Sequence, residues 1–240
     1  LGLASTLSGD DDHHHGAGPA VRDAGRLMER SARKLAGLVR SQSSMEAAIG
    51  MAAINALLPG QEERWVDLNA EEVIAQHGAG KRVALVGHFP FIPRLRERVG
   101  VLWVLEKRPS CDDLPAEAAH DVIPRADVVA ITGTTLINHT FEGLMALCRP
   151  KALVLVLGPS TPLSPVLFDH GIDILSGSVV QDVDSVLRAV SQGANFRQIH
   201  RQGVQLVTMQ KGKMSNDDNK RASISGTTRG HRPRTEAQFS

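Results

Sequence analysis

The chain has 240 residues, with 27 lysines and arginines, 26 aspartates and glutamates, and a formal net charge of +1. This length suits one large domain, or one α/β domain with a smaller partner. The basic residues are spread along the chain, aromatic residues make up 3%, and tyrosine is absent. Because proteins that bind nucleic acids combine basic patches with aromatic residues for stacking, we expect no nucleic-acid partner.

The cysteines and the apolar segments indicate the compartment. Cys111 and Cys148 form no Cys-x-x-Cys motif, which is typical of free thiols in a reducing compartment. No apolar stretch reaches the roughly 18 residues that a membrane span needs, and no signal peptide is visible. We therefore expect a cytoplasmic protein with no membrane partner. The start at Leu1, without Met, suggests a chain that is incomplete at its N-terminus.

Residues 1–60 are predicted to form a small part made mainly of two helices. Apolar residues three and four apart predict an amphipathic helix from Ala24 to Val39. The capping-box sequence Ser43–Glu46 predicts the start of a second helix, which runs to Leu58 and is apolar nearly all round. We expect this second helix to be buried.

Residues 61–80 are predicted to be a linker with one helix, and residues 81–211 a Rossmann-like domain in which strands and helices alternate. The strands are predicted at 83–86, 101–106, 128–132, 153–157, 172–175 and 204–209, the last at an edge. Helices are expected between them at 115–120, 138–148, 165–170 and 183–190. Because the strands are continuous Val, Ile and Leu runs, we expect an α/β fold with a mostly parallel sheet covered on both faces. Residues 212–240 are polar and are expected to be disordered.

Three of the strands run directly into a glycine that is followed by small or polar residues. The three glycines are Gly87, Gly133 and Gly158. The carboxyl ends of parallel strands meet at one edge of a sheet, and open α/β sheets bind their ligands there. We therefore expect the three turns to line a single site.

The first turn, from Gly87 to Pro90, does not match the Gly-x-Gly-x-x-Gly motif of dinucleotide-binding folds. Phe89 is bulky, and Pro90 lacks the amide hydrogen that a phosphate would accept, so NAD binding is disfavoured. His88 lies at the ligand edge, where an imidazole can act as a catalytic general acid or base near neutral pH. The alternative is that His88 only holds its own turn in place.

Glu106 ends the second strand of the predicted sheet. An acid at this position in nucleotide-binding folds accepts hydrogen bonds from ribose hydroxyls. Lys107 and Arg108 follow directly, so a surface ion pair explains Glu106 equally well.

The other two turns offer hydroxyl groups to a ligand. Gly133 and Thr134 begin a predicted helix, whose amides could bind an anion or could simply be capped. In Gly158–Pro162 two prolines restrain the turn, while Ser160 and Thr161 present hydroxyls. No Gly-x-Ser-x-Gly elbow surrounds Ser160, which disfavours a hydrolase nucleophile.

Asn55 is a polar residue inside the apolar second helix. An unpaired buried amide costs about 1–3 kcal/mol, so Asn55 either bonds to neighbouring backbone or reaches the ligand site. His13, His14 and His15 follow three aspartates, but consecutive residues in a loop rarely converge on one metal ion. We assign no metal ligand.

Five segments of the chain form a recognisable set of motifs. They are Ala48–Ala56, Val86–Pro90, Gly158–Leu163, Pro165–Gly171 and Leu175–Gly177. Together they resemble the family named "putative heavy-metal chelation", over a region from Gly2 to Lys211. The resemblance implies a Rossmann-like domain with some likeness to methyltransferases. A part similar to the N-terminal domain of enolase precedes it, here truncated because its opening strands are missing.

The resemblance also implies a site between the two parts, which handles a flavin-like, pterin-like or siderophore-like molecule. Carried over to this sequence, the ligand-binding residues are Asn55, Gly87, His88, Phe89, Glu106, Gly133, Thr134 and Gly158 to Thr161. The expected partner is a small planar or anionic molecule, which includes a metal chelate. No cofactor is assigned, and a homodimer is left open.

Three functions fit these residues. The leading hypothesis is a small-molecule-binding protein linked to heavy-metal chelation, with condensation or hydrolysis of the ligand as an open option. The second is a methyltransferase-like enzyme that uses S-adenosylmethionine, with Glu106 on the ribose. The third is a carrier of a metal chelate that catalyses nothing.

Overall fold

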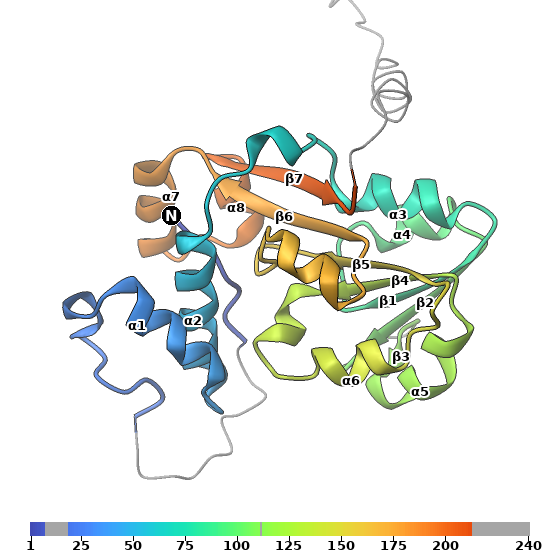
Figure 1. Ribbon diagram of the computed structural model, residues 1–240, viewed down its shortest axis with the longest axis horizontal. Coiled ribbons are helices and arrows are strands. Elements are labelled where there is room, and N and C mark those ends of the chain that lie inside the picture. The colour runs from blue at the N-terminus through green and yellow to red at the C-terminus, as the bar shows by residue number, and fades with distance from the viewer. Residues whose placement is uncertain (8–18, 111, 213–240) are drawn as a thin grey trace, which may run out of the picture.

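A seven-stranded sheet forms the centre of the computed structural model, which describes residues 1–7, 19–110 and 112–212 (Figure 1). The strands are β1 Arg82–Val86, β2 Val101–Glu106, β3 Leu114–Pro115, β4 Val128–Thr132, β5 Leu153–Leu157, β6 Ile174–Val180 and β7 Val204–Gln210. Their order across the sheet is β3-β2-β1-β4-β5-β6-β7, and every neighbouring pair is parallel except β6 with β7. The predicted α/β fold with a mostly parallel sheet is confirmed.

Short helices cover both faces of this sheet. The α-helices are α1 Ala32–Ala36, α2 Ser44–Leu57, α3 Ala70–Gly78, α4 Ile92–Arg96, α5 Ala119–Val122, α6 Phe141–Ala146, α7 Val183–Ser191 and α8 Phe196–His200. Helices α3 and α4 pack on one face, and α5 and α6 pack on the other. Every helix in the described ranges is too short or too polar for a transmembrane span.

The two-sided cover explains the continuous apolar runs of the strands. In β4, Val128 and Ala130 belong to the core under α3 and α4, whereas Val129 and Ile131 belong to the core on the opposite face. All four are at most 1% exposed. A polar residue on either face would lose its hydration, so the strand has no polar alternation.

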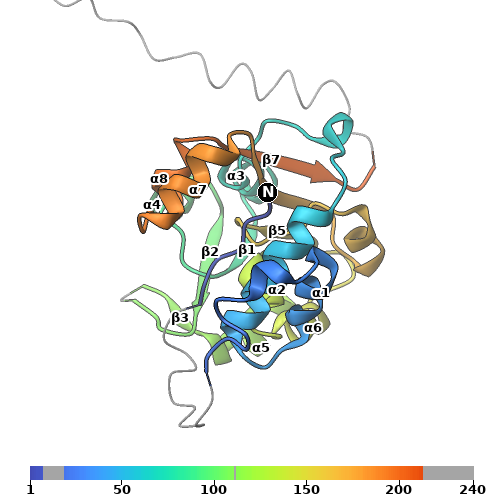
Figure 2. The same cartoon turned by 90° about the vertical axis from the view of Figure 1, so that its left-hand side faces the viewer.

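The N-terminal part lies beside the sheet, and Figure 2 shows α1 and α2 in front of it. The Ser43 hydroxyl accepts a hydrogen bond from the amide of Glu46 at 3.4 Å, which confirms the predicted start of α2. One face of α2 is buried, with Ala47 and Met51 packed against Ile137. The expected burial holds for much of α2 but not for its C-terminal end, where Leu57 is 51% exposed.

The single helix predicted from Ala24 to Val39 is wrong. Two 3₁₀ turns, Leu27–Glu29 and Gly37–Arg40, flank the five-residue α1. The reason is that Arg30 is extended and the Ser31 hydroxyl starts a new helix by accepting from the amide of Lys34. Met28, on the predicted apolar face, is fully exposed.

Other elements differ from the prediction in length or in type. His139 has a φ of +58°, so the segment from 138 to 148 begins as a turn and only α6 is helical. The predicted helix 165–170 has the expected bounds but is a 3₁₀ helix, Pro165–His170, which Gly171 ends with a φ of +84°. Strand β6 runs on to Val180 because it pairs along its full length with β7.

Two parts of the prediction stay open. The domain boundaries at residues 60 and 80, and the likeness of the first part to enolase, stay predictions. The acidic and histidine-rich residues 10–15 and most of the tail predicted to be disordered lie outside the described residues.

Candidate functional site

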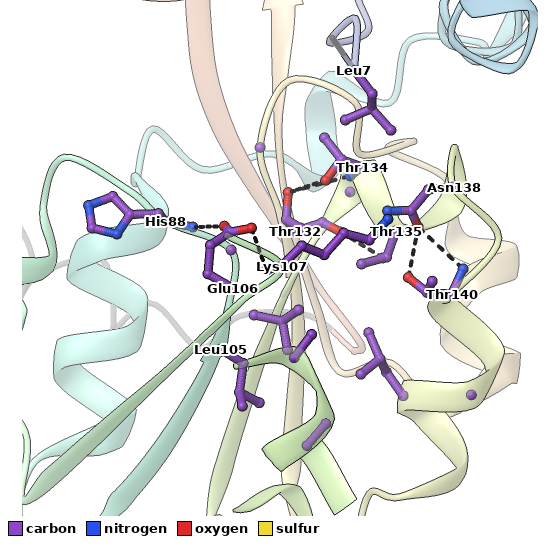
Figure 3. A pocket seen from close by; sticks show the side chains of 18 of the residues that line it. Leu7, His88, Leu105, Glu106, Lys107, Thr132, Thr134, Thr135, Asn138 and Thr140 are labelled. Atoms are coloured by element: carbon purple, nitrogen blue, oxygen red, sulfur yellow. Dashed lines mark hydrogen bonds between the residues drawn. The ribbon is translucent and has the colours of Figure 1, made fainter. Parts of the chain in front are cut away.

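A cavity of about 650 Å³ opens at the carboxyl ends of β1, β2, β4 and β5 (Figure 3). Gly87, Gly133 and Gly158, which follow three of these strands, all line it. Ser5 and Leu7 of the N-terminal segment complete the lining. The site therefore combines residues that are far apart in the sequence and lie on both parts of the chain.

The three glycines are needed for two different reasons. Gly87 and Gly158 have φ values of +104° and +106°, in the left-handed region that other residues rarely adopt. Gly133 has no such angle, but a Cβ atom there would lie 2.8 Å from the amide nitrogen of Thr161. Two of the turns thus need a special backbone angle, and the third needs close packing between neighbouring turns.

The cavity has an apolar part and a polar part. The apolar lining includes Val86, Leu105, Ala116, Ala119, Leu144 and Leu147. In Figure 3, Leu105 lies on one side of a row of polar side chains that runs from Glu106 through Thr132 and Thr134 to Asn138. Such a lining suits an organic molecule that has an apolar body and polar substituents.

Glu106 joins the ends of β1 and β2. Its Oε2 atom accepts a hydrogen bond from the amide of His88 at 3.0 Å, and its Oε1 atom accepts one from the amide of Lys107 at 2.8 Å. The carboxylate therefore fixes the turn after β1 while it also lines the cavity.

His88 lies at the edge of the cavity, and its ring points away from the row of polar groups (Figure 3). Its Nδ1 atom is 2.9 Å from Oδ2 of Asp113, whose side chain is 2% exposed. Burial acts to raise the pKa of Asp113, but hydrogen bonds from Ser110 and His88 outweigh it and hold this pKa below its ordinary value. The buried carboxylate orients the imidazole, and His88 also holds its turn against the loop after β2.

Phe89 lines the cavity beside Gly87, and its ring stacks on Phe91 with 5.2 Å between centroids. Thr132 and Thr134 bond to each other. The Thr132 and Thr134 hydroxyls are 3.0 Å apart, and the amide of Thr134 donates to the Thr132 hydroxyl at 3.4 Å. The 3₁₀ helix Gly133–Leu136 is therefore capped by its own neighbour.

Asn55 and Thr161 do not line the cavity, whereas Ser160 does. The Asn55 amide donates to the carbonyl of Leu3 at 2.8 Å and to that of Ser160 at 3.5 Å. The Ser160 hydroxyl accepts from the amide of Ser5 at 2.9 Å. These bonds tie α2 and the N-terminal segment to the turn after β5, and so support one wall of the cavity.

Sequence reasoning missed several residues of the site. Ser5, Leu7, Glu117 and His139 line the cavity, and Asp113 holds His88. None lies in a motif, and only the packing of distant segments brings them to the site.

A site for a bare metal ion needs a cluster of donor side chains. Across residues 1–7, 19–110 and 112–212, no three His, Cys, Asp or Glu side chains lie close enough together to hold a metal ion. The described part of the cavity lining therefore offers no ready set of donors for a bare ion.

Comparisons with known proteins place these features in a family. The family model DUF364, described as "Putative heavy-metal chelation", matches residues 69–209, and DUF4213, with the same description, matches residues 1–58. A crystal structure of a DUF364 protein of unknown function from Desulfitobacterium hafniense is 35% identical, with a TM-score of 0.68 over 75% of each chain.

Two further relatives are more distant. A DUF364 protein of unknown function from Pyrococcus horikoshii has the same fold, with a TM-score of 0.73, 19% identity, and coverage of 88% of this chain and 83% of that one. An uncharacterized protein of Methanocaldococcus jannaschii is 28% identical over 157 residues, which are 60% of this chain and 58% of that protein. The chain thus spans little more than half the length of this curated relative. The DUF364 match covers more than half of the sequence, and so the chain belongs to the DUF364 family, described as putative heavy-metal chelation.

Proposed function

We propose that the cavity binds a small planar organic molecule of the flavin, pterin or siderophore kind. The observation that carries this proposal is that the turns after β1, β4 and β5 line one cavity at the carboxyl edge of the sheet. Its volume of about 650 Å³ is in the range of small-molecule sites. The apolar lining suits a ring system, and the row of polar groups suits its substituents.

The family description supports a link to metals, but the described donor groups do not fit a bare ion. We propose that a metal reaches this site inside an organic chelator that supplies the donor atoms. In this form the protein acts as a carrier of the chelate, and no reaction is required.

A catalytic role, if the ligand is converted, falls to His88. Asp113 accepts the hydrogen bond at Nδ1, which leaves Nε2 to exchange a proton at the cavity edge. His88→Ala is expected to abolish turnover in a condensation or hydrolysis while ligand affinity changes less than about threefold. Turnover assays and calorimetry with the co-purified ligand check this. An unchanged rate would remove His88 from the mechanism.

S-adenosylmethionine is a second candidate ligand, because Glu106 ends β2 where an acid accepts ribose hydroxyls in nucleotide-binding folds. Isothermal titration with S-adenosylmethionine tests it. Absence of heat at millimolar cofactor would end this candidate.

The binding proposal itself is tested by filling the cavity. Gly143 lies on α6 and lines the cavity, and a Cβ atom there meets nothing within 4 Å. Gly143→Leu is expected to lower occupancy by the co-purified small molecule at least about tenfold, since the new side chain takes the space of the ligand. Native mass spectrometry of the purified chain measures this occupancy.

Ala146→Leu is the matched control, because Ala146 is exposed on the same helix and does not line the cavity. Its occupancy should equal that of the parent protein. If both variants retained the small molecule equally, the cavity would not be the binding site.

A further inference from the structure

We infer that the cavity takes its ligand without a phosphate group and binds hydrogen-bond donors of that ligand at Glu106. This inference rests on the proposed function and narrows the class of ligand. Its basis is that several backbone amides that could bind a phosphate already donate to acceptors within the protein.

The turn after β1 is where α/β folds commonly bind phosphate, through free backbone amides. Here the amide of His88 donates to the Glu106 carboxylate at 3.0 Å, and Pro90 has no amide hydrogen. The carboxylate of Glu106 thus occupies the place that an anion would take. A phosphate bound there would have to displace this carboxylate and would also be repelled by it.

The other turns at this edge show the same pattern. The amide of Lys107 donates to Glu106, that of Thr134 to the Thr132 hydroxyl, and that of Thr161 to the carbonyl of Gly158. Pro159 has no amide hydrogen. These amides therefore donate to acceptors of the protein itself and are not free to bind a phosphate.

The charged side chains of the lining also disfavour a phosphate. Among the described residues that line the cavity, the carboxylates are Glu106 and Glu117, and Lys107 is the single lysine, with no arginine. Phosphate sites use arginine forks or several cations. Two histidines of the lining face acceptors of the protein: His88 faces Asp113, and His139 Nε2 lies 2.9 Å from the carbonyl of Ser41. Among the described lining residues, His120 is the remaining histidine that could face a phosphate.

Glu106 can still accept hydrogen bonds from a ligand. A carboxylate has about four acceptor positions, and the two amides of His88 and Lys107 use one on each oxygen. Amino groups on a ligand ring, or hydroxyls on the sugar or side chain of a ligand, fit the remaining positions. The paired hydroxyls of Thr132 and Thr134 lie along the same row of polar groups (Figure 3).

Matched pairs of ligands test this inference with the full chain. Riboflavin is compared with its 5′-phosphate, and 6-hydroxymethylpterin with its diphosphate, by quenching of ligand fluorescence. At least one unphosphorylated compound is expected to bind, and at least about tenfold more tightly than its phosphorylated partner.

Two variants assign the selectivity to the carboxylates. Glu106→Gln is expected to weaken binding of the unphosphorylated ligand at least fivefold. The midpoint of thermal unfolding of this variant reports whether the turn is retained. Glu117 is exposed, so Glu117→Lys covers the case in which Glu106→Gln does not fold. Glu117→Lys should raise the affinity for the phosphorylated ligand at least threefold relative to the affinity for its unphosphorylated partner.

The outcomes separate the two proposals. If a phosphorylated ligand bound as tightly as its partner, or if Glu117→Lys changed both ligands equally, the inference would be overturned and the proposed function retained. If none of the four compounds bound at millimolar concentration, the proposed flavin-like or pterin-like ligand would be wrong, and this inference would fail with it.

Discussion

Gly50→Ala is expected to destabilise the protein by about 3 kcal/mol, at the upper end of the usual effect of overpacking. Gly50 lies on α2, and a Cβ atom there would be 2.0 Å from the backbone nitrogen of Val39. Because the obstacle is backbone rather than a flexible side chain, α2 must move away from the 3₁₀ helix Gly37–Arg40. Urea unfolding of the two proteins measures the difference.

The same substitution at Gly143 is the matched control. Gly143 is also helical, but its Cβ position is open. Replacing a helical glycine by alanine reduces the conformational freedom of the unfolded chain, so Gly143→Ala should stabilise by about 0.5–1 kcal/mol. Opposite signs for the two substitutions are expected. Equal effects would show that close packing at Gly50 does not govern its contribution.

Gly50→Ala is also expected to weaken ligand binding, although Gly50 does not line the cavity. Helix α2 packs Ala47 and Met51 against Ile137, just before His139 in the cavity lining. Displacing α2 therefore shifts the segment from Ile137 to His139, which forms part of the cavity wall.

Glu46→Ala is the second substitution with a large expected effect, a loss of about 2 kcal/mol at pH 7. The Glu46 side chain is 3% exposed and accepts hydrogen bonds from the backbone and guanidinium of Arg22, at 2.8 to 2.9 Å, and from the Ser41 hydroxyl at 2.7 Å. Its removal leaves these donors without their acceptor. Glu29→Ala, in an exposed pair with Arg26, is the control and should change stability by less than about 0.5 kcal/mol.

The contribution of Glu46 depends on pH in a defined direction. Hydrogen bonds from Arg22, opposed by burial, lower the pKa of Glu46 from 4.5 to about 2 in the folded protein. A lowered pKa gives stability that is fully present above the ordinary pKa and is lost as the pH falls towards about 2. The difference in unfolding free energy between the parent and Glu46→Gln should therefore shrink between pH 5 and pH 2.5. A difference that stayed constant would contradict the ion pair as its source.

Acid unfolding also involves other carboxylates, of which Asp127 is the clearest example. Hydrogen bonds from Arg82 and Arg149 lower its pKa as well. Asp127 titrates in the parent and in Glu46→Gln alike, so the difference between the two proteins reports on Glu46 alone.

The local features of this fold were predictable from the sequence because they depend on neighbouring residues. Apolar runs such as Val128–Thr132 require cover on both faces, and Ser43 starts a helix through a bond to a residue three positions away. The glycines after three strands indicated the edge at which the cavity lies. Continuity of a helix was harder to predict: the helix predicted from Ala24 to Val39 is broken at Arg30, which is extended, and Met28 on its predicted apolar face is fully exposed.

Short segments of the sequence encode the six longer strands, the start of α2 and the edge of the sheet that holds the cavity, because backbone preference and burial depend on neighbouring residues. The tertiary structure alone decided which groups meet. In the folded chain Glu106 accepts a hydrogen bond from the amide of His88, and Asp113 bonds to the imidazole of His88. Ser5 bonds to Ser160, which is 155 positions away in the sequence. Such pairs depend on the packing of whole elements, and so no local pattern of residues specifies them.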